Sequence, residues 1–219
     1  MAGYEAAIVR VRCWTAGCPT AGLGLLVGVD QVVTCAHVVN TSLGRRQDEQ
    51  AAPGRSDLVQ VEFPLLPGAP VRDARVVAWE PPHGLGIGGG DVAGLVLTED
   101  APAGVTPGRF MSVVPAPGTW LRVFGYPGDP PRPSGAFVDV DLKGQVGTQM
   151  LQVESRSGQT VRAQPGFSGS PVWDPATGRA AGLLQAAPRV GEPQHDAFLL
   201  QPGAAAAVRR PTVSGQGIQ

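Results

Sequence analysis

Glycine and proline interrupt this chain at short intervals, and that spacing limits what it can fold into. The 31 glycines and 22 prolines are scattered between short segments rich in Val and Leu. Because both residues interrupt helices and favour turns, the pattern is typical of an all-β protein, and helical periodicity is almost absent. We expect about a dozen strands, at Ala6–Arg12, Leu23–Val29, Gln31–Thr34, Leu58–Phe63, Val71–Trp79, Asp91–Leu97, Trp120–Phe124, Ala136–Leu142, Met150–Glu154, Ser170–Trp173, Ala180–Gln185 and Ala197–Gln201.

The number of these segments predicts a closed architecture. Two six-stranded Greek-key β-barrels would use all of them, and closed barrels avoid the exposed edges of open sheets. We expect the first barrel at about residues 5–100 and the second at about 115–202, joined by Thr98–Gly118, where Ala, Pro and Gly cluster. Residues 1–202 would then form the domain and 203–219 a linker-like tail. The tail leads to the hypothesis that the chain is a module of a longer polypeptide.

Length and charge narrow the range of partners. The chain has 219 residues, of which 42% are hydrophobic, enough to bury a core in one domain or two small lobes. Only 16% of the residues are charged and the net charge is -1, so neither nucleic acid nor a membrane surface is expected as a partner. The N-terminal residues lack the basic segment and the long apolar run of a secretion signal. We therefore expect a cytoplasmic protein.

The three cysteines are too few for a disulfide framework, which also favours a reducing compartment. Cys13 and Cys18 are expected to be ordinary thiols, although their spacing also allows a small disulfide loop or part of a metal site. Cys35 stands two residues before His37. Because neighbouring chain positions rarely let a sulfur face an imidazole, we expect Cys35 to be a buried apolar side chain and not a nucleophile. Nothing in the sequence indicates a metal or an organic cofactor.

Three polar residues in separate apolar surroundings predict a nucleophilic site. Ser168 lies in Gly166-Phe167-Ser168-Gly169-Ser170, directly before a β-like segment, which suits an exposed nucleophile. His37 and Asp91 precede it along the chain. A serine hydroxyl is a poor nucleophile near neutral pH, and an imidazole oriented by a carboxylate can remove its proton. The order His, Asp, Ser differs from that of the α/β-hydrolases and subtilisin and is the order found in two-barrel enzymes.

These motifs resemble those of the trypsin-like serine peptidase family, over about Ile8 to Pro202. Thr34-Cys35-Ala36-His37 is similar to the family's Thr-Ala-Ala-His block, and Asp91-Val92-Ala93 is similar to its Asp-Ile-Ala block. Gly166-Phe167-Ser168-Gly169-Ser170-Pro171 is similar to its Gly-Asp-Ser-Gly-Gly-Pro block. Each block alone is a short pattern, but three in the family's order are jointly specific.

The resemblance implies a role for each of these residues. His37 would be the general base, Asp91 would orient its ring, and Ser168 would be the nucleophile. The backbone N–H groups of Gly166 and Ser168 would bind the oxyanion. Glycine at position 166 suits this task, because without a Cβ it can adopt a conformation that points its amide inward.

The chain departs from the family at Phe167. Zymogen-activated members carry aspartate at this position, where it pairs with a newly formed amino terminus, and an aromatic side chain cannot make that ion pair. In this respect the chain resembles the bacterial high-temperature-requirement proteases, which are switched by the ordering of loops. We hypothesise that the oxyanion segment Gln164–Gly166 is regulated by a neighbouring domain or partner protein.

The resemblance also indicates where a substrate side chain would bind. Arg162 precedes the nucleophile by six residues, and Gln185 and Ala187 lie on a later apolar strand whose edge would pair with an extended substrate. Members that prefer Lys or Arg carry an acid where Arg162 stands, so that preference is disfavoured. A surface position for Arg162 is the alternative.

The sequence thus predicts a serine endopeptidase that hydrolyses a protein or peptide substrate through an acyl-enzyme, in the setting of a bacterial signalling or defence protein. A catalytically silent module with the same fold, which binds a peptide without cleaving it, is the alternative from another functional class. An esterase or another acyl transferase on the same scaffold is a further alternative.

Overall fold

The regular secondary structure in the described part of the chain consists almost entirely of strands. The computed structural model describes residues 3–14, 20–82, 90–146, 150–186 and 196–200. These residues contain thirteen strands, the α-helix α1 and the 3-10 helix η1. In chain order the elements are η1 (Glu5–Ala7), β1 (Ile8–Val11), β2 (Gly22–Leu26), β3 (Gln31–Thr34), α1 (Ala36–Ser42), β4 (Val59–Glu62), β5 (Val71–Glu80), β6 (Val92–Leu97), β7 (Arg109–Phe110), β8 (Trp120–Gly125), β9 (Ala136–Val146), β10 (Met150–Ser155), β11 (Pro171–Asp174), β12 (Arg179–Ala186) and β13 (Asp196–Leu200).

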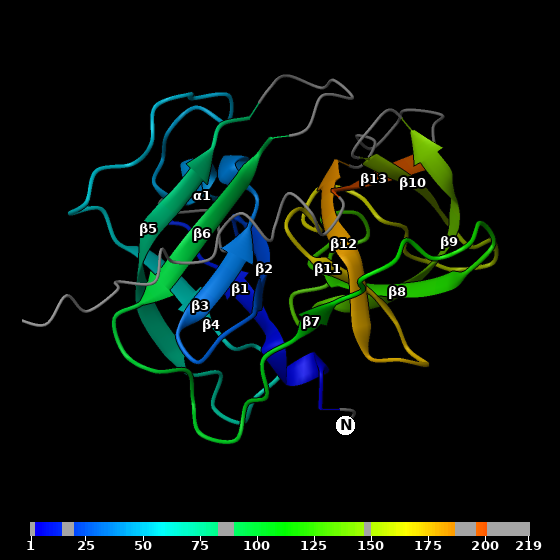
Figure 1. Ribbon diagram of the computed structural model, residues 1–219, viewed down its shortest axis with the longest axis horizontal. Helices are drawn as coiled ribbons and strands as arrows, with labels where there is room; N and C mark the ends of the chain where they lie inside the picture. The colour runs from blue at the N-terminus through cyan, green and yellow to red at the C-terminus, as the bar shows by residue number, and fades with distance from the viewer. Residues whose placement is uncertain (1–2, 15–19, 83–89, 147–149, 187–195, 201–219) are drawn as a thin grey trace, which may run out of the picture.

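The first six strands close into a barrel, on the left of Figure 1, in the order β1-β2-β3-β6-β5-β4. Neighbouring strands pair antiparallel throughout. In β4, Val59 and Val61 are buried and Gln60 between them is partly exposed, as expected of a strand with one face on a core. In the pair formed by β3 and β6, Thr34 lies opposite Ala93, and these strand ends position the site described below.

The later strands form a second sheet, on the right of Figure 1, in the order β11-β8-β9-β10-β13-β12-β7. A further pairing between β11 and β12 closes six of these strands into a ring, and β7 joins β12 in parallel. Along β9, the side chains of Val138, Val140 and Leu142 are buried, whereas the residues between them are at least partly exposed. The expected all-β fold with two barrels is therefore confirmed, with β7 as an added edge strand.

Three elements were not expected from the sequence: α1, β7 and η1, which includes Ala6 and Ala7 from the segment expected as a strand. The helix α1 starts directly after β3, and its seven residues are too few to produce a clear helical period. Cys35, the residue before α1, is extended, with φ of −80° and ψ of 146°, so the chain passes from strand to helix at one position. The strand β7 lies within Thr98–Gly118, which was expected to be only a connection. The predicted tail, residues 203–219, lies outside the described residues.

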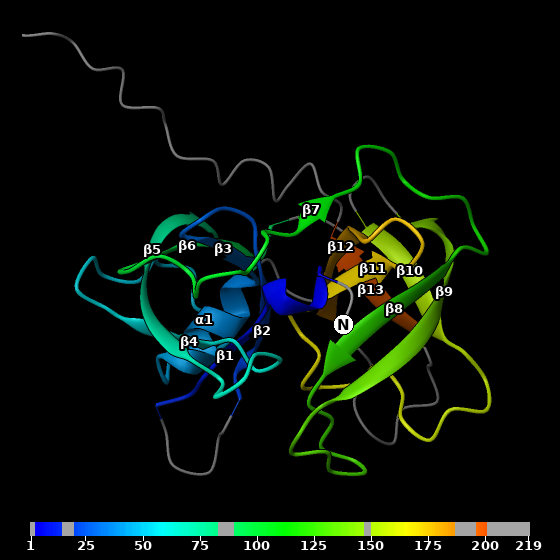
Figure 2. The ribbon, with the colours of Figure 1, turned by 90° about the horizontal axis from the view of Figure 1, so that it is seen from below.

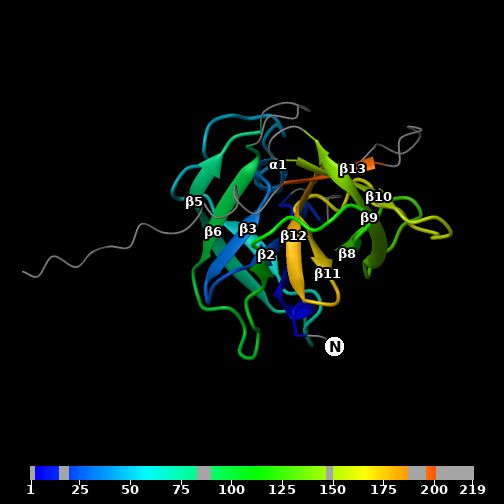
Figure 3. The ribbon, with the colours of Figure 1, turned by 45° about the vertical axis from the view of Figure 1, so that its right-hand side comes forward.

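The two barrels meet where β2 contacts β11 (Figure 3). The Arg10 guanidinium of β1 lies 4.9 Å from the centroid of the Tyr126 ring, which follows β8. Arg10 also pairs with Glu62 of β4 at 2.7 Å. Next to η1, which lies between the barrels in Figure 2, the ring of Tyr4 is 5.1 Å from that of Trp173 in β11. The N-terminal segment and β1 therefore connect the two barrels through aromatic contacts.

The cysteines differ in one respect from the prediction. Cys13 is disulfide-bonded, so the expectation of an ordinary thiol at this position is wrong. The prediction relied on the weak signal of two cysteines with four residues between them and no second Cys/His pair, whereas one disulfide needs only two Cβ atoms at a suitable distance. Cys18 lies outside the described residues, and Cys35 is free and buried.

In the described ranges, no helix has both the length and the hydrophobicity needed to cross a bilayer.

Candidate active site

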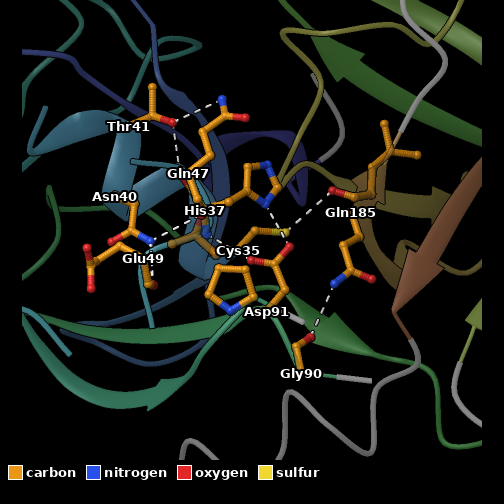
Figure 4. Close-up of polar contacts among 12 residues, drawn as sticks. Cys35, His37, Asn40, Thr41, Gln47, Glu49, Gly90, Asp91 and Gln185 are labelled. Atoms are coloured by element: carbon orange, nitrogen blue, oxygen red, sulfur yellow. Dashed lines mark hydrogen bonds and ion pairs between the residues drawn. The ribbon is translucent and has the colours of Figure 1, made fainter. Parts of the chain in front are cut away.

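His37 and Asp91 face one another beyond the ends of two paired strands. β3 ends at Thr34, opposite Ala93 of β6; His37 follows in the first turn of α1, and Asp91 precedes β6. Strand pairing therefore brings together two side chains that are 54 positions apart. His37 Nδ1 lies 2.6 Å from Asp91 Oδ2, and the His37 backbone N–H donates to Asp91 Oδ1 at 2.8 Å (Figure 4).

This double contact assigns a role to each imidazole nitrogen. Asp91 is only 4% exposed, and an ionised carboxylate can only accept hydrogen bonds. Nδ1 of His37 therefore carries the proton that Asp91 accepts, which leaves Nε2 as the acceptor. The His37 side chain is 17% exposed. The site thus holds an oriented imidazole whose ring remains partly accessible.

The backbone before β6 has an uncommon conformation. Asp91 has φ of +60°, and Gly90 before it has φ of +83°. Aspartate is among the few residues other than glycine that adopt the left-handed region. The Asp91 N–H donates to Pro81 O at 3.0 Å, and the Gln185 side-chain amide, from β12, donates to Gly90 O at 3.3 Å (Figure 4). Both barrels therefore help to place the Asp91 carboxylate.

Cys35 lies beside this pair but is poorly suited to act as a nucleophile. The thiol is fully buried, and its Sγ donates to Leu184 O at 3.6 Å. Burial raises the pKa of the Cys35 thiol well above its usual value, and the Asp91 charge raises it further. At neutral pH the thiol is therefore protonated, whereas the thiolate is the nucleophilic form.

The same three residues have the spacing of a metal site. The donor atoms of Cys35, His37 and Asp91 all lie within 4.8 Å of one another. Both oxygens of Asp91 already accept hydrogen bonds from His37, and metal binding would require a deprotonated thiol. The arrangement therefore suits proton transfer by His37 better than it suits a metal ion.

Ser168 lies just before β11, against the first barrel. Its carbonyl oxygen accepts a hydrogen bond from Leu23 N–H of β2 at 2.8 Å, and the next amide, that of Gly169, donates to Leu184 O at 2.6 Å. Gly169 has φ of +78°, and a Cβ there would stand 2.1 Å from Leu23 O, so this close approach requires glycine. Leu184 O also accepts from the Cys35 thiol. The serine segment is thus tied to the junction between β3 and α1.

The structure brings the Ser168 backbone to the part of the molecule that carries His37 and Asp91. Ser168 is half-buried, and its hydroxyl forms no hydrogen bond with any residue that the structure describes. Hydrogen bonds between catalytic groups are often long in ligand-free enzymes and tighten when substrate binds. The joint action of the three side chains is therefore a proposal.

The segment Gln164–Phe167 is a tight turn, closed by a hydrogen bond from Phe167 N–H to Gln164 O at 3.1 Å. Proline and glycine at its two central positions are typical of a type II turn, and Gly166 has φ of +102°. A Cβ at Gly166 would lie 2.1 Å from Tyr126 O. Neither Gly166 N–H nor Ser168 N–H has an acceptor in the described ranges. Both amides are therefore free to bind an oxyanion.

Phe167, which replaces the aspartate of zymogen-activated relatives, is fully buried in the second barrel. A Cβ at Gly125 of β8 would lie 2.3 Å from the Phe167 ring, so the ring packs directly on the β8 backbone. The residue therefore serves as a core contact and supplies no carboxylate for an activating ion pair.

The three residues expected at the primary pocket differ in their surroundings. Arg162 is exposed. Gln185 is partly buried, and its side chain is bonded to the first barrel. Ala187 lies outside the described residues. β11 pairs with β12 only as far as Pro171↔Leu183, so Gln185 lies beyond the last pair of these two strands.

Two polar side chains near the site have roles that sequence reasoning missed. Gln164 Nε2 donates to Asp129 O at 2.6 Å, and Asp129 N–H donates to Gln164 Oε1 at 3.2 Å. Asn40, buried in α1, donates to the carbonyl oxygens of Gln47 and Glu49 and so holds the loop after the helix. The partners of Gln164 and Asn40 are backbone groups, which every residue has, so residue types do not predict these hydrogen bonds. The Pro-Gly turn signal before Ser168 does not predict them either.

The sequence matches the model of a known family. A family model described as a trypsin-like peptidase domain matches residues 22–183, so this chain belongs to the trypsin-like peptidase family and is a serine-type peptidase. No curated protein matches the chain.

Several solved structures share the fold. The Rv3671c protease from M. tuberculosis in its active form has a TM-score of 0.67 and 21% identity, over 100% of this chain and 86% of that chain. A serine-to-alanine mutant of Rv3671c in an inactive form has a TM-score of 0.64 and 20% identity, over 100% and 92%. The inactive form of the Rv3671c protease has a TM-score of 0.63 and 21% identity, over 94% and 88%. At these identities the likeness establishes the fold alone.

Proposed function

We propose that this chain is a serine endopeptidase that cleaves a protein target with His37, Asp91 and Ser168. The observation that carries the proposal is the double contact between Asp91 and His37, which leaves His37 Nε2 as a proton acceptor. The Ser168 backbone is bound to the same region through Leu23. An oriented imidazole, a buried carboxylate and a serine are the groups that acyl transfer requires.

In the proposed reaction, Ser168 Oγ bonds to the carbonyl carbon of the scissile peptide while His37 Nε2 takes the hydroxyl proton. Asp91 stabilises the imidazolium and keeps the proton on Nδ1. The carbonyl oxygen becomes an oxyanion that accepts from Gly166 N–H and Ser168 N–H, each donor contributing about 10²–10³-fold in kcat. His37 then gives its proton to the leaving amine as the C–N bond breaks. Water, activated by His37, attacks the acyl-enzyme and releases the carboxylic acid and free Ser168.

The substrate is proposed to lie extended beside β12 near Gln185, where it would pair with the strand. Arg162 and Ala187 belong to the same proposed primary pocket, and an arginine there disfavours Lys and Arg side chains in the substrate. A bacterial, cytoplasmic setting and control by a regulatory domain or partner protein belong to this proposal. The disulfide at Cys13 weakens the redox argument for the cytoplasm, because disulfides are rare in reducing compartments.

The test is covalent labelling with a fluorophosphonate probe, together with cleavage of a peptide library. Wild type should react and cleave, and Ser168→Ala should do neither. Ser157→Ala, which changes an exposed serine of the second barrel, should behave as wild type. Equal labelling of wild type and Ser168→Ala would contradict the assignment.

Two further outcomes would favour the alternatives. A wild-type protein that binds peptides but neither reacts nor cleaves them would be the silent binding module. Turnover of esters without turnover of matched peptides would indicate an esterase.

A further inference from the structure

We propose that Gln164 is a positioning residue that holds the oxyanion turn in place, an inference that rests on the proposed peptidase function. Gln164 is 9% exposed and is the first residue of the turn that contains Gly166. Both ends of its side-chain amide bind one residue: Nε2 donates to Asp129 O at 2.6 Å and Oε1 accepts from Asp129 N–H at 3.2 Å. The side chain thus bridges the turn to the loop between β8 and β9.

The bridge adds to contacts that join the turn region to the end of β8 and to the chain that follows it. Ser170 Oγ donates to Phe124 O at 2.6 Å, and Tyr126 N–H donates to Gly166 O at 3.0 Å. These contacts hold the nucleophile segment and the later half of the turn. The Gln164 bridge holds the first half of the turn.

Anchoring the first half matters because of how tight turns rearrange. Type I and type II turns share the closing hydrogen bond and differ by a rotation of the central peptide. Here that peptide joins Pro165 to Gly166 and carries the Gly166 N–H, one of the two proposed oxyanion donors. The closing bond from Phe167 to Gln164 would survive such a rotation, so other contacts must fix the turn. The Gln164 bridge sets the position from which the Pro165–Gly166 peptide projects.

The position of Asp129 makes the bridge suitable for mutation. Asp129 is exposed, so water can reach this residue when Gln164 is replaced. An unsatisfied buried backbone group, which would destabilise the whole barrel, is therefore avoided. The expected defect is local to the turn.

The chain supplies a matched control in Gln159. Gln159 Nε2 donates to Asp139 O at 2.7 Å, and Asp139 N–H donates to Gln159 Oε1 at 2.8 Å. These two contacts match those of Gln164, in the same barrel, but they join the segment after β10 to Asp139 of β9, and Gln159 Nε2 also donates to Arg156 O at 3.1 Å. A merely structural role for such bridges predicts similar effects at both positions.

The experiment compares Gln164→Met, Gln159→Met and wild type in the full chain. For Gln164→Met we expect kcat on a cleaved peptide to fall about 10- to 100-fold while KM changes less than about threefold, because a misplaced donor weakens the transition state more than the bound substrate. Gln159→Met should keep kcat within about twofold of wild type, whatever its thermal midpoint. Hydrogen exchange measured by mass spectrometry should become faster across residues 160–170 in Gln164→Met only.

Three results would overturn this inference. They are a wild-type kcat in Gln164→Met, a fall in kcat in Gln159→Met as large as that in Gln164→Met, or a Gln164→Met protein in which only KM changes. If Gln164→Met does not fold, Gln164→Glu replaces it, because glutamate keeps the acceptor for Asp129 N–H and loses only the donor. An unchanged kcat in folded Gln164→Glu would also refute the role.

Failure of the proposed function can be told apart from failure of this inference. If wild type shows no peptidase activity, the proposed function has failed, and hydrogen exchange alone decides on Gln164. Unchanged exchange across residues 160–170 in Gln164→Met would then refute the anchoring role.

Discussion

Asp91→Asn tests the hydrogen-bond argument at the site by replacing one oxygen with an NH2 group. In the structure, Oδ1 accepts from the His37 backbone N–H at 2.8 Å and Oδ2 lies 2.6 Å from Nδ1. A backbone donor can be satisfied only by the amide oxygen of asparagine. The NH2 group would therefore face Nδ1, which must then accept, and the imidazole proton would move to Nε2. In that tautomer His37 cannot take a proton from Ser168.

The expected loss is large and falls mainly on kcat. Asparagine at the orienting position lowers kcat by about 10⁴-fold through the wrong tautomer, which corresponds to about 5.5 kcal/mol of transition-state stabilisation. KM should change little, because Asp91 is buried behind His37 and is not placed to contact the substrate. The assay is steady-state hydrolysis of a cleaved peptide by wild type and Asp91→Asn, with thermal unfolding to confirm that both fold.

The matched control is Asp48→Asn. Asp48 is an exposed carboxylate that pairs with Arg46 at 2.8 Å, and the loss of such a surface pair should leave kcat within about twofold of wild type. A folded Asp91→Asn protein that keeps kcat within about tenfold of wild type would refute the reasoning, since neither the tautomer nor the carboxylate charge would then matter.

Two further predictions concern the turn and the buried thiol. Gly166→Ala should lower kcat by about 10²–10³-fold, because its Cβ would lie 2.1 Å from Tyr126 O and the residue has φ of +102°; peptide kinetics with wild-type rates would contradict this. Cys35→Ala should keep kcat within about threefold, and iodoacetamide at neutral pH should not inactivate the folded wild type, because the raised pKa keeps the Cys35 thiol protonated. Rapid inactivation of wild type that Cys35→Ala resists would show that the thiol is reactive.

The strands could be predicted because their signals are local. β5 was expected at Val71–Trp79 and runs over Val71–Glu80, and β9 was expected from Ala136 and starts there, extending to Val146. Buried and exposed residues alternate along β9, and Gly or Pro precedes both strands; signals of this kind act over a few positions. The helix α1 was not predicted, because a helix of seven residues has too few turns to show a helical period in its sequence.

The sequence predicted the contact that the structure shows for only some of the residues of the site. The motifs pointed to His37 and Asp91, and the structure places the two in hydrogen-bond contact. The part that Ser168 plays stays a prediction, as do the roles of Gly166 and the pocket residues. The disulfide at Cys13 contradicts the expectation of an ordinary thiol, because the spacing of cysteines along the chain does not show which thiols lie close together.

By itself the sequence determined where strands form, which family the motifs resemble and which side chains have the chemistry for acyl transfer, since each depends on residue type and short-range order. Only the tertiary structure decided how the site is held together. Gln185 donates to Gly90 O across 95 positions and Gln164 bridges to Asp129 across 35. Such contacts join an ordinary amide side chain to backbone groups that every residue possesses, so they arise from the way the barrels pack and cannot be recognised in residue type.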